Sequence, residues 1–303
     1  MNQIKLFFTK DWPSNSAGKQ DYELLDTGEG EKLEKFGKYT FVRPYENAVW
    51  SKCATPSVQQ MWKNVDGKFW SSKVGAKAGW KMETKIEEKW EMQYKGIKFF
   101  ASPTPFRHLG FFPEQASHWD FIENSIKSSD RKIKFLNLFG YTGVASLFAL
   151  RAGAEVTHLD ASKQTLNWAK ENEKLNSHLG LTGMRVIEDD AIKFLEREAK
   201  RGNKYDAVIM DPPKFGRGPK GEVWKIEEML PKLLSAVQKV LSDKPLFVIL
   251  TSYAIDSSSL PLGYALEETM RDFSGNVEAG ELCVLEKSNN RIISLANTAV
   301  WRV

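Results

Sequence analysis

The chain has 303 residues, of which 42% are apolar and 27% charged, as in globular proteins and unlike disordered or membrane-embedded ones. Its length suffices for two domains, and no run reaches the roughly 20 apolar residues that a membrane span needs. The formal charge of +4 arises in the first 100 residues, where 17 Lys and Arg face 13 Asp and Glu. Two distant cysteines and four histidines without ligand spacing predict no disulfide framework and no metal site.

Residues 1–100 are predicted to form a small β-rich domain, since short alternating segments (39–42, 68–70 and 90–94) are separated by glycine turns. The first residues hold too short an apolar stretch for a signal peptide, and with the few cysteines this favours a cytoplasmic protein. Six of the ten tryptophans lie here, among several lysines. Two interpretations stay open: a basic aromatic surface for RNA, or a tryptophan core with solvated lysines. The residues concerned are Lys52, Lys63, Lys68, Lys73, Lys77, Trp62 and Trp70.

The remainder, residues 101–303, alternates between apolar runs and amphipathic segments. Strands are expected at 133–139, 156–160, 184–188, 205–210 and 245–252, and helices at 112–127, 144–152, 162–176, 191–200 and 226–241. The last segments, 281–287 and 291–302, are typical of an antiparallel hairpin that turns at Asn289-Asn290. The order predicts an α/β fold with a doubly wound, Rossmann-like sheet of seven strands, preceded by the β-rich domain.

A glycine-containing turn joins the first strand of this sheet to its helix. It reads Asn137-Leu138-Phe139-Gly140-Tyr141-Thr142-Gly143. The glycines permit a tight turn and close approach to a ligand, and the helix offers free N–H groups. The turn lacks the full Gly-x-Gly-x-x-Gly pattern of dinucleotide enzymes, so it is weak evidence alone.

Acids follow at the next two strand ends. Asp160 ends its strand about 20 residues after the turn, where a carboxylate can accept both hydroxyls of a ribose. The alternative is a helix cap, although Ser162 is also a suitable N-cap for that helix. At the third strand end, the acid of Asp190 and the N–H of Ala191 can read an adenine edge. Helix capping explains Asp189 and Asp190 equally well.

The fourth strand ends in Asp211-Pro212-Pro213-Lys214-Phe215. Each proline fixes φ and removes an N–H, so the segment is stiff and can present a carboxylate and carbonyls to a donor group. Phe215 offers a flat surface for stacking. The alternative is a proline turn with Asp211 as a helix cap. A nucleoside cofactor explains the first three features, and this fourth one favours a methyltransferase acting on a base over a dehydrogenase.

Together these segments resemble the motifs of class I S-adenosylmethionine-dependent methyltransferases. More narrowly, they are similar to the bacterial large-subunit ribosomal RNA base methyltransferases, which modify cytosine C5 or guanine N7. The segment Leu109-Gly110-Phe111-Phe112-Pro113-Glu114-Gln115 resembles the motif that leads the cofactor domain of that branch. The resemblance covers about residues 106–303.

The resemblance implies S-adenosylmethionine as cofactor. The expected cofactor-binding residues are Gln115, Asn137, Phe139, Gly140, Tyr141, Thr142, Gly143, Asp160, Ser162, Asp190 and Ala191. The expected catalytic residues are Asp211, Pro212, Pro213 and Phe215. Arg217 and Lys220, in an expected flexible loop over 216–221, are available for phosphate.

One departure bears on the chemistry. The cytosine-C5 enzymes carry a nucleophilic cysteine after the fifth strand, and here Tyr253 holds that position. We therefore expect methyl transfer to a base nitrogen of RNA, in particular ribosomal RNA, and not to cytosine C5. The alternatives are a methyltransferase of a small molecule or protein side chain, and a non-catalytic RNA-binding assembly factor.

Overall fold

The computed structural model describes residues 4–9, 12–14, 18–70, 78–253 and 258–303. The chain forms two compact units, each assembled from separate stretches of sequence. The first contains residues 1–7, 117–282 and 294–303, and the second contains residues 8–116 and 283–293. No helix within the described ranges is both long and apolar enough to cross a membrane.

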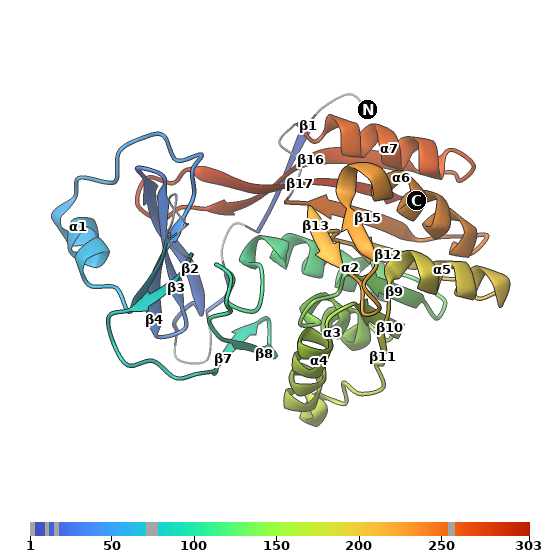
Figure 1. The fold of residues 1–303 in the computed structure, drawn as a ribbon, viewed down its shortest axis with the longest axis horizontal. Helices are drawn as coiled ribbons and strands as arrows, with labels where there is room; N and C mark the ends of the chain where they lie inside the picture. Colours follow the sequence, from blue (N-terminus) through green and yellow to red (C-terminus); the bar gives the residue numbers. More distant parts are fainter. Residues whose placement is uncertain (1–3, 10–11, 15–17, 71–77, 254–257) are drawn as a thin grey trace. The chain divides into compact units, whose positions relative to one another are not determined.

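The first unit is built on an eight-stranded sheet in the order β1-β16-β17-β15-β12-β9-β10-β11 (Figure 1). Its strands are β1 (Ile4–Phe8), β9 (Lys134–Leu138), β10 (Glu155–Asp160), β11 (Arg185–Glu188), β12 (Ala207–Met210), β15 (Phe247–Ser252), β16 (Asn276–Leu285) and β17 (Ile292–Arg302). The five central strands run parallel, and β17 is antiparallel to β15.

Alternating side chains along the buried strands supply two cores, one on each face of this sheet. Leu136, Val208 and Val248 pack in one core with helices α5 (Ala191–Lys200), α6 (Ile226–Val240) and α7 (Leu260–Met270). Phe135 and Ile209 pack in the other with α2 (Ala116–Lys127), α3 (Val144–Arg151) and α4 (Lys163–Leu175). Because a strand's side chains alternate between faces, a run that is apolar throughout marks a strand covered on both sides.

The predicted doubly wound α/β fold is confirmed, and each predicted strand and helix of this unit is present within a few residues. Several elements were not anticipated, among them strand β1, helix α7 and the short strands β13 and β14 (Phe215–Arg217 and Val223–Lys225), and β1 makes the sheet eight-stranded where seven strands were expected. Strand β1 adds to the sheet edge, where the backbone of Lys5 lies so close to Gly280 that a Cβ there would overlap it. Helix α7 follows β15 and buries Leu262 and Leu266.

The second unit has a five-stranded sheet, β2-β3-β4-β5-β6, and a separate hairpin, β7-β8. Its strands are β2 (Tyr22–Gly28), β3 (Glu31–Phe36), β4 (Tyr39–Pro44), β5 (Gly67–Trp70), β6 (Gly79–Met82), β7 (Trp90–Tyr94) and β8 (Ile97–Ala101), and one helix, α1 (Pro56–Lys63), precedes β5. Aromatic rings fill its interior, with Phe36 and Phe99 each meeting Phe111 edge-on at 5.5 and 4.8 Å between centroids. The predicted β-rich N-terminal region is therefore present.

The lysines of this unit are largely engaged with acids. Lys52 and Lys68 both pair with Glu31, at 2.7 and 2.5 Å, and Lys52 also lies 4.1 Å from the centroid of the Trp62 ring. Trp62 donates its indole N–H to the buried Asp26. Lys52 and Lys68 are thus paired, whereas Trp70 is 39% exposed, so both interpretations stay open. Lys73 and Lys77 lie outside the described residues.

The tip of the β16–β17 hairpin belongs to the second unit. Lys287 and Ser288 donate their backbone N–H groups to the carbonyls of Leu24 and Leu25, at 2.9 and 3.1 Å. Glu286, fully buried, accepts a hydrogen bond from Thr27. The second unit therefore takes part of its structure from the C-terminal segment. A functional boundary between residues 1–100 and 101–303 stays a prediction.

Candidate functional site

The register of the parallel strands brings the four motifs together at one edge of the sheet. Leu138 is level with Met210 on one side and Leu159 on the other, and Asp160 is level with Glu188. The residues that follow these positions therefore leave neighbouring strands, which are spaced about 4.8 Å apart. The chain order reverses between β9 and β12, and ligands of doubly wound folds bind at this kind of switch point.

The loop from β9 to α3 is held in an unusual conformation. Phe139 and Tyr141 have φ of 57° and 54°, a left-handed geometry that costs a non-glycine residue about 1–3 kcal/mol. Gly143 has φ of 83° and stands as the N-cap of α3. A Cβ on Gly140 would lie 2.3 Å from Cε1 of His158, so no larger residue fits there without displacing that ring.

A chain of buried hydrogen bonds lies beneath this loop. The Asn137 amide donates to Oγ of Ser146 at 3.0 Å, and Ser146 lies 3.0 Å from Nδ1 of His158. Nε2 of His158 is 3.3 Å from the carbonyl of Tyr141. Because a carbonyl can only accept, Nε2 carries the proton and Nδ1 accepts from the serine hydroxyl. His158 thus holds the backbone of Tyr141 through a hydrogen bond to its carbonyl. The sequence alone did not indicate this role for the histidine.

Asp160 ties the loop to the next helix. Its two carboxylate oxygens accept from the backbone N–H groups of Tyr141 and Ser162, both at 2.9 Å. Ser162, not Asp160, is the N-cap of α4, since its hydroxyl accepts from the N–H of Thr165 at 3.4 Å. The alternative of Asp160 as a helix cap is therefore wrong. In addition, Thr142 is held through its carbonyl by the amide of Asn172 at 2.9 Å.

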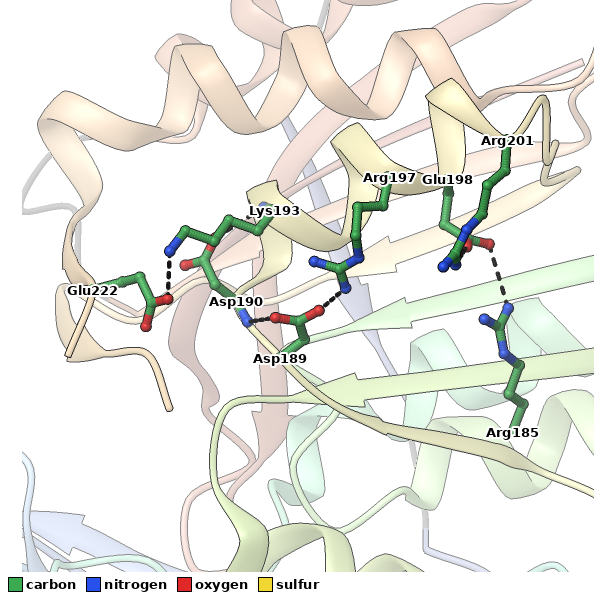
Figure 2. A network of polar contacts seen from close by, with 8 residues as sticks. All are labelled: Arg185, Asp189, Asp190, Lys193, Arg197, Glu198, Arg201 and Glu222. Atoms are coloured by element: carbon green, nitrogen blue, oxygen red, sulfur yellow. Dashed lines mark hydrogen bonds and ion pairs between the residues drawn. The ribbon is translucent and has the colours of Figure 1, made fainter. Parts of the chain in front are cut away.

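The third acid motif starts helix α5. Asp190 is the N-cap of this helix and accepts from the N–H of Lys193 at 3.0 Å, so the capping interpretation is confirmed for it. Asp189 accepts from Arg197, about two turns into the same helix, as Figure 2 shows. The capping hydrogen bond uses Oδ1 of Asp190 and not Oδ2, and Ala191 is the first residue of the helix. Capping and adenine recognition are thus compatible.

Beyond the fourth strand, the chain forms a hairpin and not the expected flexible loop. Strands β13 (Phe215–Arg217) and β14 (Val223–Lys225) pair antiparallel, with Gly216 opposite Trp224. Asp211 is half-buried and Pro212 buried, whereas Phe215 is 56% exposed. No helix follows Asp211, so the helix-cap alternative for this residue is wrong.

Trp224 connects the hairpin to both halves of the site. Its buried indole N–H donates to the carbonyl of Pro213 at 2.6 Å. Its ring meets that of Phe139 edge-on, with centroids 5.0 Å apart. Phe139 belongs to the segment 137–143 that leads from β9 into α3 (the cofactor turn), and Pro213 belongs to residues 211–215 (the proline segment). The side chain of Trp224 therefore contacts both the cofactor turn and the proline segment. Nothing in the linear order of the motifs indicated this contact.

Two further residues need separate mention. Gln115 ends the short helix η1 (Pro113–Gln115) and is buried in the second unit, so its contact with the cofactor stays a prediction. Tyr253 follows β15, at the place where a cytosine-C5 enzyme would need its cysteine. In the described part of the chain, no three His, Cys, Asp or Glu side chains gather as a metal centre requires.

The hydrogen-bonding groups at the strand ends fit a nucleoside cofactor. A carboxylate has about four acceptor positions, and the backbone of Tyr141 and Ser162 uses two of those on Asp160. The remaining positions suit ribose hydroxyls. The close glycine turn before α3 suits the amino-acid end of the cofactor, and Asp190 with the N–H of Ala191 suits its adenine. The geometry thus defines a nucleoside-binding α/β domain.

Comparison with known proteins narrows this class. The family described as S-adenosylmethionine-dependent methyltransferase matches residues 74–276. The crystal structure of the S-adenosylmethionine-dependent methyltransferase from Agrobacterium tumefaciens is 40% identical, covers 100% of this chain and 97% of that chain, and superposes with a TM-score of 0.87. The chain therefore belongs to the S-adenosylmethionine-dependent methyltransferase family and is an enzyme that uses this cofactor.

Curated relatives match a shorter stretch. Ribosomal RNA large subunit methyltransferase K/L of Pseudoalteromonas translucida is 32% identical over 48% of this chain and 20% of its own length. Ribosomal RNA large subunit methyltransferase I of Aeromonas salmonicida is 30% identical over 41% of this chain and 30% of its own length. The chain thus spans less than a third of either relative.

Replacing Gly140 by alanine tests the loop. The new Cβ would overlap His158, so the loop must shift, and we expect affinity for S-adenosylmethionine to fall about tenfold or more, or roughly 1.4 kcal/mol. Titration calorimetry of the folded variant measures this. Gly79→Ala is the matched control, because a Cβ on Gly79 would lie 3.9 Å from its nearest neighbour, Cζ2 of Trp70, and would overlap nothing. Equal affinity in Gly140→Ala and wild type would contradict the role of this glycine.

The buried histidine predicts a pH dependence of stability. Burial lowers the pKa of His158 from 6.5 to about 4. Between these values the unfolded chain binds a proton that the folded ring does not, so the unfolding free energy falls as the pH falls. This ring alone contributes a loss of about 3 kcal/mol. Burial lowers the pKa of His108 and His118 to about 3, which acts in the same direction.

Denaturant unfolding at pH 6.5 and pH 4 measures the effect. We expect His158→Gln to lower stability at the higher pH and to reduce the difference between the two conditions. The exposed His178, replaced by glutamine, serves as control and should leave that difference unchanged. An undiminished pH difference in His158→Gln would show that this ring is not the group responsible.

Proposed function

We propose that this methyltransferase modifies a base nitrogen in RNA, in particular ribosomal RNA, in the cytoplasm. The observation that carries the proposal is the adjacency of the Asp160 and Gly140 motifs to the Asp-Pro-Pro-Lys-Phe segment across the switch point. That arrangement puts a stiff acceptor segment and an aromatic ring beside the cofactor turn. The names of the ribosomal RNA large subunit methyltransferases K/L and I support RNA as the substrate.

One group of site residues binds S-adenosylmethionine, and a second group binds the target base. S-adenosylmethionine supplies an electrophilic methyl group when bound. Asp160 accepts hydrogen bonds from its ribose, Asp190 and Ala191 read its adenine, and the turn that contains Asn137, Phe139, Gly140, Tyr141, Thr142 and Gly143 encloses its amino-acid end. Ser162 holds the orientation of Asp160 through its backbone N–H. Gln115 is proposed to reach the cofactor as well.

The proline segment acts on the substrate. Asp211 and the Pro212 carbonyl accept hydrogen bonds from a target amine, which directs the nitrogen lone pair at the methyl group. For a ring N–H, Asp211 takes the proton, so that the lone pair becomes available. The N–C bond forms as the S–C bond breaks, and the surplus proton leaves through Asp211 to water. Phe215, which is 56% exposed, stacks on the base. The Pro213 carbonyl accepts from Trp224, which holds the segment in place. Its second lone pair can still accept a hydrogen bond from the substrate. Catalysis of this kind consists mainly of positioning.

The atom modified is a nitrogen and not cytosine C5. Carbon attack needs a thiolate that adds to the ring first, and the position that would supply it is Tyr253. A nitrogen carries its own lone pair and needs no covalent help. Neither Cys53 nor Cys283 directly follows one of the parallel strands of the eight-stranded sheet, and Cys283 is buried within β16.

Transfer of a labelled methyl group tests the substrate class. The wild-type enzyme is incubated with labelled S-adenosylmethionine and, in parallel, with unmodified ribosomal RNA, intact ribosomal subunits, a protein fraction and a small-molecule fraction. We expect label in RNA or in the RNA of the subunits, with an N-methylated base on nucleoside analysis. Label confined to the protein or small-molecule fraction would refute RNA, and 5-methylcytosine would refute nitrogen.

Asp211 provides a sharper test of mechanism. We expect Asp211→Ala to lower kcat roughly 100-fold, because the target nitrogen loses its alignment, while Kd for S-adenosylmethionine stays within about twofold. Single-turnover kinetics and titration calorimetry measure the two quantities separately. Asp243→Ala, at an exposed acid before β15, is the control and should change neither. Equal losses of kcat and cofactor affinity in Asp211→Ala would contradict the assigned role.

A further inference from the structure

The β13–β14 hairpin has two faces of different character. The pairing sets Phe215 opposite Lys225 and Arg217 opposite Val223, and all four side chains are exposed. Trp224, between Val223 and Lys225 in β14, is buried on the other face. Since side chains of paired strands alternate, the exposed four share one surface. Phe215 and Val223, 56% and 49% exposed, are among the larger apolar side chains that this unit presents to solvent.

Cations surround these apolar groups. Residues 214–225 carry Lys214, Arg217, Lys220 and Lys225 against a single acid, Glu222. That acid is already engaged, because Lys193 of α5 binds it at 2.6 Å, as Figure 2 shows. Lys225 pairs with Glu228 at 2.9 Å, but both side chains are exposed, and such surface pairs exchange readily. The exposed face therefore alternates in character: Phe215 and Val223 lie on one diagonal of the pairing, and Arg217 and Lys225 lie on the other.

The hairpin is also firmly attached to the site. Trp224 binds the carbonyl of Pro213 and packs on Phe139, and Gly216 lies so near that its Cβ position is 3.5 Å from the Pro213 ring. At the turn, Glu222 accepts from the backbone N–H of Lys220 at 2.9 Å as well as from Lys193. The exposed face thus begins at Phe215, four residues after Asp211, in a fixed relation to the proline segment.

We infer that this face, formed by Phe215, Arg217, Val223 and Lys225, binds the RNA strand next to the target base. The inference rests on the proposed function and extends it by naming where the strand lies. Arg217 and Lys225 bind phosphates of the flanking nucleotides, and Phe215 and Val223 contact the bases or sugars. A cationic track beside aromatic surface is how proteins bind single strands without reading sequence.

An acidic protein segment is the other polyanion that such a face could attract. RNA is favoured because an exposed aromatic ring has cations on two sides: Lys225 is paired with Phe215, and Arg217 lies two residues along the same strand. Directly paired residues are about 5 Å apart, and residues two apart in one strand about 7 Å. A ring in that setting stacks on a base while the cations meet the backbone. A protein ligand remains one outcome of the test.

The test compares two double variants in the full-length enzyme. Arg217→Ala with Lys225→Ala removes two charges from the hairpin face. Lys132→Ala with Lys204→Ala removes two exposed charges just before β9 and β12, at the amino ends of these strands. The probe is an unmodified single-stranded oligoribonucleotide of about 12 nucleotides, a length within the usual site sizes for single strands. Its binding is followed by fluorescence anisotropy over a range of salt concentrations.

We expect the hairpin variant to bind the probe about tenfold or more weakly at low salt. The slope of log K against log salt should fall by about 1.4, since each lost phosphate contact on a single strand accounts for roughly 0.7. The other double variant should retain the wild-type slope. Affinity for S-adenosylmethionine and the unfolding midpoint should match wild type in both, which separates lost docking from lost structure.

Two results would overturn the inference, and they are distinguishable. If wild type methylates RNA and the hairpin variant keeps its RNA affinity and salt slope, RNA is the substrate but docks elsewhere. If wild type labels only protein and does not bind the probe, both this inference and the RNA substrate fail. In that case, a raised KM of the hairpin variant for the labelled protein would identify the face as a protein-binding one.

Discussion

The conformation of the β9–α3 loop depends on the buried chain of hydrogen bonds beneath it. Phe139 and Tyr141 hold left-handed backbone angles that non-glycine residues avoid, and such strain persists only where the surroundings fix it. Asn137, Ser146 and His158 fix it from below, and Asp160 fixes it from the side. Because the buried imidazole is neutral, the network adds no uncompensated charge to the core.

The sheet then determines which motifs can cooperate. Each motif is separated from the next by at least 17 residues of sequence, yet the register places them on adjacent strands of one edge. The reversal of strand order between β9 and β12 leaves a space there that no connecting helix crosses. The β9–α3 loop and the proline segment leave adjacent strands at this point, since β9 and β12 are paired.

Much of this could be predicted from the sequence, for reasons that are local. The helix 191–200 was expected at its observed bounds because Asp190 is a strong N-cap before an amphipathic run, and Ser162 was recognised as a cap in the same way. The central strands were found because both faces are buried, which leaves continuous apolar runs. Strand β1 and the role of His158 could not be predicted, because both depend on contacts between residues remote in sequence. Strand β1 pairs with a segment more than 270 residues away, and His158 looks like any core histidine until its partners Ser146 and Tyr141 are placed.

The hairpin after Asp211 illustrates the same limit and explains the design of the site. Residues 216–221 hold three glycines and a proline, a composition typical of a flexible loop, and two strands of three residues give no periodic signal. Order comes from Trp224, which is too far along the chain to be read as part of the proline motif. Prolines cannot donate hydrogen bonds, so the segment needs an outside donor to be fixed, and the indole N–H supplies it. Because the same ring packs on Phe139, the position of the proline segment is fixed directly against the β9–α3 loop.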